Sequence, residues 1–266
     1  MYEQYWGLSV LPFQNVPDPS FYFPSDMHQQ GLKKLLYTVE QGKGVGMLTG
    51  EIGCGKTTLV RTFMDHLPEE KYDVALITHP DLPRNEFLQE INVQFGIKGP
   101  GQTRERLWKA LTFHCSANLT AGVETVLIVD ETQSIHENDV LEELRQILNL
   151  QLNERFLITL ILVGQPELKE RVGRSRQLDQ RIAIRYHLGP LDSVETLKYV
   201  QHRLHVAGGT REIFSPEAVQ LIWQYTRGVP RSINNVADLC LLYGLESQRP
   251  IIDAPMVRKA AAEVSA

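Results

Sequence analysis

The segment from Gly50 to Thr57 constrains the fold of this chain more than any other part of the sequence. It reads Gly-Glu-Ile-Gly-Cys-Gly-Lys-Thr and matches the phosphate-binding pattern G-x-x-x-x-G-K-[ST] at every fixed position. A short apolar stretch, 46–49, precedes it and an amphipathic stretch, 58–64, follows it, as expected for a strand, a loop and a helix. A glycine-rich turn without a ligand would fit the letters alone. The flanking elements favour a nucleoside triphosphate site.

The residue types of this loop suit the chemistry of phosphate binding. Glycines let the backbone turn its N–H groups toward the phosphates, and the following helix offers its positive N-terminal end to an anion. Lys56 can reach the β- and γ-phosphates, and the Thr57 hydroxyl can bind Mg²⁺. Cys54 is either a small residue that fits a tight turn or a reactive thiol near the helix N-terminus. The residues expected to bind the nucleotide here are Gly50, Glu51, Ile52, Gly53, Cys54, Gly55, Lys56, Thr57 and Thr58.

Two carboxylates follow a second apolar run. Residues 125–129 read Thr-Val-Leu-Ile-Val and are followed directly by Asp130 and Glu131. We expect Asp130 to hold Mg²⁺ through water, and Glu131 to orient and deprotonate the attacking water. An ordinary solvated strand end is the alternative. Because the ends of parallel strands meet at one edge of a sheet, the functional interpretation is favoured.

A third apolar run, 159–163, is followed by Gly164 and Gln165. The side chain of Gln165 would stand between the two preceding motifs, where it could sense the γ-phosphate or position water. Capping of the following helix is the alternative role. We favour the sensor.

A basic stretch covers residues 169–185 and has three competing interpretations. It could be a solvated helix face, or a patch for DNA phosphates, although aromatic stacking partners are absent from it. It could also supply an arginine finger that enters the nucleotide site of a neighbouring subunit. Arg181 is the favoured finger, with Arg176 and Arg185 as alternatives.

Another arginine follows a Gly-Val-Pro turn near the end of the chain. Arg231 stands at an expected helix start, where it could read the γ-phosphate as part of a mobile lid. A turn followed by a surface charge is the alternative. Because the chain also carries the two carboxylates and the phosphate loop, we favour the interpretation of Arg231 as a γ-phosphate sensor.

The order of elements predicts an α/β core followed by a helical region. Short apolar runs alternate with helix-like segments, which indicates a parallel sheet covered on both faces by helices. The candidate strands are 45–49, 74–78, 126–130, 159–163 and 184–188. The candidate helices between them include 84–95, 104–118 and 138–150, and four more follow at 192–206, 216–227, 231–246 and 255–264. We expect an N-terminal strap at 1–40 packed on the core, an α/β domain at 41–191 and a helical lid at 192–266.

Composition narrows the class of protein. With 266 residues the chain can bury a full core, and a net charge of −5 argues against a wholly basic nucleic-acid coat. The apolar run 156–163 is too short to span a bilayer, and no secretory signal is visible at the N-terminus. The three cysteines are scattered, which suits a reducing cytoplasm.

Taken together, these residues make the chain resemble the ExeA/GspA-like family of AAA+ ATPases (general secretion pathway protein A-like). Further matching segments extend over nearly the full length and lie at 5–8, 12–13, 17–19, 42–44, 164–168, 176–182 and 228–234. The resemblance implies a P-loop AAA+ core with a helical lid and an ATP- and Mg²⁺-dependent homo-oligomer. Lys56, Thr57, Asp130, Glu131 and Arg231 would carry the corresponding family roles. The family commonly reads Asp-Glu-Ala-Gln after the second motif's strand, and Thr132 replaces that alanine here.

The resemblance also bears on partners. Secretion-pathway members continue into a membrane span, whereas this chain resembles the stand-alone form without one. The expected client is secretion or sorting machinery, or a transposase. The leading hypothesis is an ATP-hydrolysing switch that oligomerises through its nucleotide site. The alternative is an ATP-dependent DNA-binding adaptor of the transposition target-selector type, with slow regulatory hydrolysis. A small-molecule P-loop kinase is a third and weaker hypothesis, because the carboxylate pair and the lid suit hydrolysis better.

Overall fold

The computed structural model describes residues 1–16, 18–99, 101–152 and 155–264. The chain forms two compact units. We call them the sheet unit, residues 29–51 and 59–188, and the helical unit, residues 1–28, 52–58 and 189–266.

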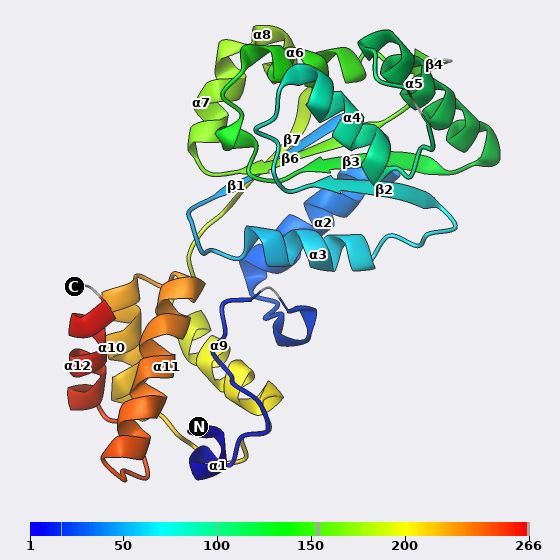
Figure 1. The fold of residues 1–266 in the computed structure, drawn as a ribbon. Helices are drawn as coiled ribbons and strands as arrows, with labels where there is room; N and C mark the ends of the chain where they lie inside the picture. Colours follow the sequence, from blue (N-terminus) through cyan, green and yellow to red (C-terminus); the bar gives the residue numbers. More distant parts are fainter. Residues whose placement is uncertain (17, 100, 153–154, 265–266) are drawn as a thin grey trace. The chain divides into compact units, whose positions relative to one another are not determined.

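The sheet unit is built on a five-stranded sheet (Figure 1). Its strands are β1 (Val45–Gly50), β2 (Tyr72–Ile77), β3 (Glu124–Val129), β6 (Thr159–Gly164) and β7 (Ile182–Leu188). They lie in the order β2-β3-β6-β1-β7, and every neighbouring pair is parallel. The predicted parallel sheet is confirmed, with strand ends shifted by one or two residues.

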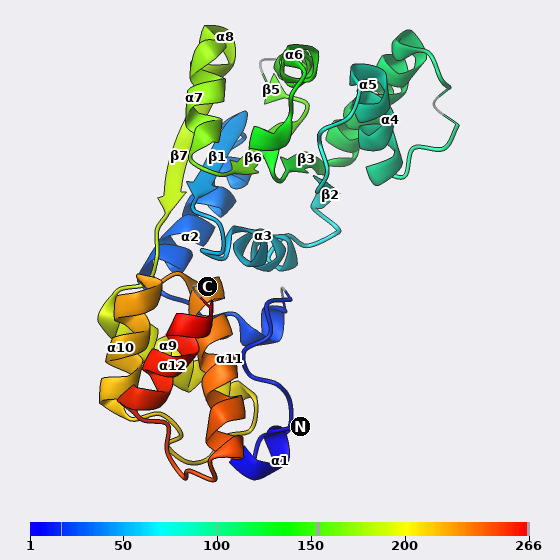
Figure 2. The same cartoon turned by 60° about the vertical axis from the view of Figure 1, so that its left-hand side comes forward.

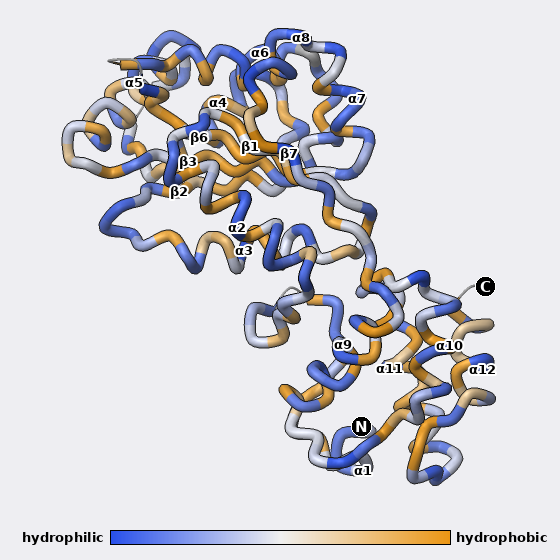
Figure 3. The backbone as a smooth tube through the Cα atoms, turned by 180° about the vertical axis from the view of Figure 1, so that it is seen from behind, coloured by the Kyte–Doolittle hydropathy of each residue, from blue (hydrophilic) through white to orange (hydrophobic). Residues whose placement is uncertain are grey.

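The strands are apolar because both faces of the sheet are covered. Every residue of β1 and β6 is buried. Figure 3 shows that the residues of the sheet strands are largely hydrophobic. Side chains alternate between the faces, so Met47, Leu127 and Leu162 join one core with the helices of that side. On the other face Gly46 lies against Thr38 of a covering helix, where an added Cβ would come within 3.2 Å.

Helices cover the two faces of this sheet (Figures 1 and 2). On one side lie α2 (Asp26–Glu40) and α3 (Lys56–Asp65). On the other side lie α4 (Arg84–Gln94), α5 (Arg104–Ala121), α6 (Asn138–Ile147) and α7 (Glu167–Arg174), and α7 is followed by the short α8 (Arg176–Asp179). A turn of 3₁₀ helix, η2 (Thr132–Ser134), follows β3, and a small antiparallel hairpin, β4 (Gln151–Leu152) and β5 (Arg155–Phe156), precedes β6.

The helical unit combines the C-terminal helices with the start of the chain. Its elements are α1 (Glu3–Trp6), η1 (Pro19–Phe21), α9 (Ser193–Val206), α10 (Pro216–Thr226), α11 (Pro230–Glu246) and α12 (Ala254–Val264). The N-terminal aromatic residues belong to its core: Trp6 is 1% exposed, and its indole Nε1 donates to the carbonyl of Leu241 at 2.9 Å. An added Cβ on Gly244 would lie 2.3 Å from the same ring, so only glycine allows this approach.

The helix starts of this unit follow local sequence signals. Asp192 caps α9 in a capping box with Glu195, and Ser215 caps α10 with Pro216 in its first turn. No strand was predicted here, and among the described residues of this unit the structure adds one isolated parallel bridge, between Phe214 and Ile252. The C-terminal helical region therefore agrees with the sequence.

Candidate nucleotide site

The phosphate loop connects β1 to α3. It leaves the sheet at Gly50 and ends at Lys56 and Thr57, which begin the helix. Gly53 and Gly55 have φ values of +82° and +94°, a region that residues with a side chain rarely adopt. The loop shape therefore requires glycine at these two positions, and it continues directly into a helix N-terminus.

The side chains of the loop differ in exposure. Lys56 and Cys54 are buried, at 6% and 0% exposed, whereas Ile52 is 58% exposed. A buried thiol is poorly accessible to reagents, so the structure favours a small residue that fits the turn at Cys54.

Within the helical unit a histidine packs against the loop. An added Cβ on Gly55 would lie 2.8 Å from His28 Nε2, so the imidazole ring and the loop backbone are in close contact. The other ring nitrogen of His28 hydrogen-bonds to Ser25 Oγ at 2.8 Å, and the ring also hydrogen-bonds to the backbone of Cys54. Burial lowers the pKa of His28 to about 4, so the ring is neutral at physiological pH. His28 was not predicted as a site residue.

Arg231 also lies against the loop backbone, at Gly53. Its N–H donates to the carbonyl of Gly53 at 3.2 Å, and an added Cβ on Gly53 would lie 2.6 Å from Arg231 Cβ. Its side chain is exposed and stands in the first turn of α11. The preceding turn needs Gly228, which has φ +75° and where a Cβ would lie 1.8 Å from the Leu191 carbonyl oxygen. The turn thus brings Arg231 to the loop.

A cavity of the helical unit adjoins the loop at Gly55 and Thr58. Aromatic side chains form much of its wall, among them Phe21 and Tyr199. Tyr22 also lines it, and its buried hydroxyl has no hydrogen-bond partner among the described residues. A buried polar atom of this kind usually has a partner, so the Tyr22 hydroxyl offers a hydrogen bond to a group that enters this space, whose volume is about 60 Å³.

Two buried polar residues hold the N-terminal segment in place around this cavity. Arg203 is 7% exposed and donates from Nε to the carbonyl of Pro12 at 2.6 Å and from Nη2 to that of Gln14 at 2.9 Å. Asn234 donates to the side chain of Asn15 at 3.1 Å. Neither residue was predicted from the sequence, because their partners are remote in the chain.

The two carboxylates lie at the carboxyl edge of the sheet unit. Asp130 is 3% exposed, and its N–H continues the sheet by donating to the carbonyl of Ile77 at 2.8 Å. Glu131 has a left-handed backbone, φ +51°, and its N–H donates to Asp130 Oδ1 at 2.8 Å. Left-handed residues other than glycine are uncommon and concentrate at functional sites.

Gln165 follows β6, the strand that lies between β3 and β1. Its N–H donates to Gln133 Oε1 at 2.9 Å, and Gln133 Nε2 donates to Glu131 Oε2. Arg171 of α7 donates to the backbone carbonyl of Gln133. Gln133 and Arg171 were not predicted as site residues. A signal for Gln133 was its place in the Asp-Glu-Ala-Gln pattern.

The AAA domain family matches residues 39–172 of the chain. The chain belongs to this family. General secretion pathway protein A of Aeromonas hydrophila is 39% identical over 247 residues, which cover 91% of this chain and 44% of that relative. The chain thus spans less than half of the relative's length. The resemblance to GspA-like ATPases is confirmed.

Solved structures agree on the fold of this AAA protein. The ORC2 protein of Aeropyrum pernix, in ADPNP–ADP complexes, has 20% identity and a TM-score of 0.70, over 95% of this chain and 70% of that one. The Drosophila ORC bound to DNA has 19% identity and a TM-score of 0.71, over 96% of this chain and 64% of that one. At such identities the likeness shows the fold alone, and it confirms the predicted P-loop AAA+ architecture.

The three candidate finger arginines of this AAA protein differ in their contacts. Arg181 donates to the carbonyl of Leu148 at 2.7 Å and to Asn149 Oδ1 at 2.6 Å. Arg185 pairs with Asp179 at 2.9 Å. Arg176 begins α8 and is exposed. Arg181 is therefore held by the residues just after α6, and Arg185 of β7 by the last residue of α8.

The described residues lack two further features, a membrane-spanning helix and a cluster of metal ligands. None of the helices there combines the length and the apolar character that crossing a membrane requires. No group of three or more His, Cys, Asp or Glu side chains lies close enough together there to hold a metal ion.

Proposed function

We propose that this chain binds ATP through its phosphate loop and hydrolyses it as an oligomer that acts on a macromolecular partner. The observation that carries the proposal is the loop, in which Gly53 and Gly55 adopt positive φ just before the N-terminus of α3. Such a turn aims backbone N–H groups at a phosphate, and the helix end adds positive potential. Membership of the AAA domain family supports the same activity.

The base of the nucleotide would enter the cavity beside Gly55 and Thr58. Its aromatic wall suits the faces of a purine, and the hydroxyl of Tyr22 could bond to the polar edge of the ring. In this proposal the N-terminal segment is a strap near the nucleotide base; plain packing on the core is the alternative.

The donor atoms of the chain suit a magnesium ion. Thr57 offers a hydroxyl and Asp130 a carboxylate, the hard oxygen donors that Mg²⁺ prefers, with phosphate oxygens and water completing such sites. When bound, the ion supplies positive charge against the β- and γ-phosphates.

The remaining roles fall to side chains around the triphosphate. Lys56 would bind the β- and γ-phosphates, and Glu131 would orient the attacking water and accept its proton. Gln165 and Arg231 would sense the γ-phosphate from the end of β6 and from α11. Together these groups account for binding, activation of water and detection of hydrolysis.

Oligomerisation would complete the site. In this proposal Arg181 enters the nucleotide site of a neighbouring copy and stabilises charge on the transferred phosphoryl group. The client would be secretion or sorting machinery, a class suggested by the GspA relative, or a transposase. A cytoplasmic location stays a prediction.

Two substitutions test the proposal. Lys56→Ala should abolish ATP binding, because it removes the cation that contacts the terminal phosphates. Glu131→Gln should bind ATP but turn it over about 10²- to 10⁴-fold more slowly, the usual contribution of a general base. Binding is measured with a fluorescent ATP analogue in the presence of Mg²⁺, and turnover by phosphate release.

A matched control is Lys71→Ala, which removes an exposed lysine just before β2. It should leave binding and turnover unchanged. Failure of the folded wild-type chain to bind ATP at millimolar concentration would refute the proposal.

The alternative of an ATP-dependent DNA-binding adaptor stays a prediction. It is tested by measuring ATP turnover and mobility shift with and without duplex DNA at low and high salt. Binding through phosphate contacts should weaken steeply with salt. Absence of any ATP-dependent shift at low salt would exclude this alternative.

A further inference from the structure

Gln133 is bonded at three points beside the proposed catalytic carboxylate. Its Nε2 donates to Glu131 Oε2, and its Oε1 accepts the backbone N–H of Gln165 at 2.9 Å. Its backbone carbonyl accepts a hydrogen bond from Arg171 Nη1. Both ends of the side-chain amide and the backbone are thus held, by the turn after β3, by the residue after β6 and by α7.

We propose that Gln133 is the positioning residue for Glu131 and couples this carboxylate to the end of β6. The inference rests on the ATP hydrolysis proposed above, in which Glu131 activates water. In this proposal Gln133 acts only through Glu131 and makes no contact of its own with the nucleotide or the attacking water.

The backbone of Glu131 explains why such a residue is needed. With φ +51° it is held in a left-handed conformation, which persists only where surrounding contacts determine it. The amide of Gln133 fixes the carboxylate through Oε2. This leaves Oε1 as the oxygen that can accept a proton from water.

The packing around Gln133 determines which way its amide points. An added Cβ on Gly164, the last residue of β6, would lie 2.4 Å from Gln133 Oε1, so the amide oxygen lies directly on the strand end. Because that oxygen accepts the N–H of Gln165, the amide nitrogen must face the other way. A nitrogen donor facing Glu131 is the arrangement that a carboxylate acceptor requires.

The same contacts give a route from the γ-phosphate to Glu131. Gln165 is the proposed phosphate sensor, and its backbone N–H bonds directly to the amide that holds Glu131. Arg171 ties the backbone of Gln133 to α7. A shift of the β6 end or of α7 is therefore transmitted to the carboxylate through Gln133.

Gln133→Met tests the proposal, since it keeps the length of the side chain and removes both polar ends. We expect kcat to fall about 10- to 100-fold, as for a misplaced catalytic group, with the Kd for ATP and the Tm unchanged. The amide of Gln165 should exchange its hydrogen faster, since it loses its acceptor. Hydrogen exchange measures this without any turnover.

Gln94→Met is the matched control. The amide of Gln94 also donates to a carboxylate, Glu90 Oε1, at 2.7 Å, but on the exposed face of α4. This variant should keep the wild-type kcat and the wild-type exchange rate at Gln165.

Two further variants separate positioning from folding. Gly164→Ala displaces the amide of Gln133 without altering it, and should lower kcat with ATP binding retained. In a Glu131→Gln background, Gln133→Met should cause no additional loss, because the carboxylate through which it acts is already gone.

The outcomes distinguish this inference from the proposed function. Wild-type or higher turnover in Gln133→Met, in a chain whose wild type binds and hydrolyses ATP, would overturn the inference and leave the function standing. If Gln133→Met weakens ATP binding and lowers Tm as well as kcat, the residue has a structural role, and the inference is overturned as well. A wild-type chain that neither binds nor hydrolyses ATP would overturn both.

Discussion

Single residues around the phosphate loop take their properties from burial. His28 is 6% exposed, and its ring lies between the hydroxyl of Ser25 and the backbone of Cys54 and Gly55. A neutral imidazole has one donor and one acceptor nitrogen, which suits a hydroxyl on one side and a backbone group on the other. His28 therefore supports the loop in its neutral form.

The burial of His28 predicts how the stability of the fold depends on pH. Burial lowers the pKa of His28 from 6.5 to about 4, so between these values the unfolded chain binds a proton that the folded chain does not. The free energy of unfolding should therefore fall as pH falls from about 6.5 toward 4, by up to about 3 kcal/mol for this group. His28→Gln should lose less stability over the same range. Tm measured at intervals between pH 7.5 and 4.5 checks the difference.

The control is His66→Asn, which removes an exposed histidine just after α3. It should reproduce the wild-type dependence of Tm on pH. Parallel curves for the wild type and His28→Gln would contradict the prediction.

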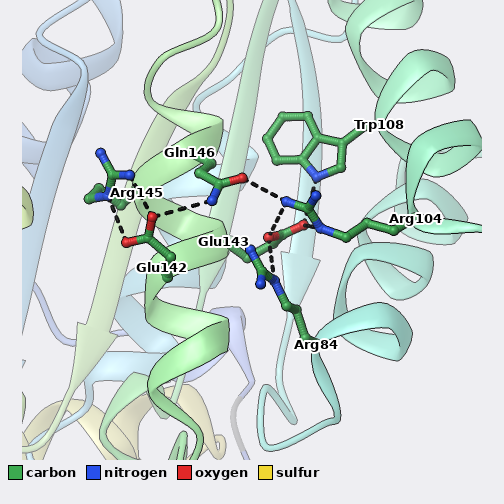
Figure 4. Close-up of polar contacts among 7 residues, drawn as sticks. All are labelled: Arg84, Arg104, Trp108, Glu142, Glu143, Arg145 and Gln146. Atoms are coloured by element: carbon green, nitrogen blue, oxygen red, sulfur yellow. Dashed lines mark hydrogen bonds and ion pairs between the residues drawn. The ribbon is translucent and has the colours of Figure 1, made fainter.

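At the scale of elements, one carboxylate joins three helices of the sheet unit (Figure 4). Glu143 of α6 is fully buried and accepts hydrogen bonds from Arg84, the first residue of α4, and from Arg104, the first residue of α5. The indole of Trp108 donates to it as well, at 2.6 Å. A positive side chain is unfavourable at a helix N-terminus, and the shared carboxylate compensates for it at two helices at once.

Replacing this carboxylate should loosen the three helices. Glu143→Gln leaves two guanidinium groups without their anion and should lower the free energy of unfolding by about 2 to 3 kcal/mol, the scale of hydrogen bonds to a charged group. Denaturant unfolding measures the change. Glu142→Gln is the matched control, because Glu142 is 40% exposed and pairs with Arg145 at the surface (Figure 4). Equal losses in the two variants would contradict the role of Glu143.

The elements also show where sequence patterns are informative. The strands were predicted because they are continuous apolar runs, which buried parallel strands require. Helix α2 (Asp26–Glu40) and the β4–β5 hairpin were not predicted. Helix α2 follows an aromatic, proline-rich segment, in which no clear helix start was recognised. Each strand of the hairpin is too short to show an alternating hydrophobic pattern.

The phosphate loop begins in the sheet unit and ends in the helical unit. Residues 52–58 belong to the helical unit, through the contacts of Gly53 with Arg231 and of Gly55 with His28, whereas β1 before them belongs to the sheet unit. The boundaries predicted at residues 40 and 191 stay a proposal about domains.

The final prediction concerns assembly. Arg181→Ala should bind ATP normally and hydrolyse it about 10³-fold more slowly or worse, as expected on loss of an arginine finger. Mixing it with Glu131→Gln should restore turnover, since a subunit with an intact Glu131 can then receive Arg181 from its neighbour. Phosphate release from mixtures of the two variants measures this complementation.

Mixing Lys56→Ala with Glu131→Gln is the control for this experiment. Both residues would act within their own subunit, so no combination restores a complete site. If turnover is lost in Arg176→Ala or Arg185→Ala and is restored by mixing that variant with Glu131→Gln, that residue would be assigned as the arginine finger instead of Arg181.

Features that contiguous residues encode could be predicted from the amino-acid sequence. The phosphate loop needs glycine at set positions, and buried strands need apolar runs, so both are legible in the chain. The tertiary structure alone decided how Gln133, Glu143 and His28 are used, because each depends on hydrogen bonds or burial that distant segments provide. A polar side chain looks the same in sequence whether water or a remote backbone group satisfies it, and only folding brings that partner into reach.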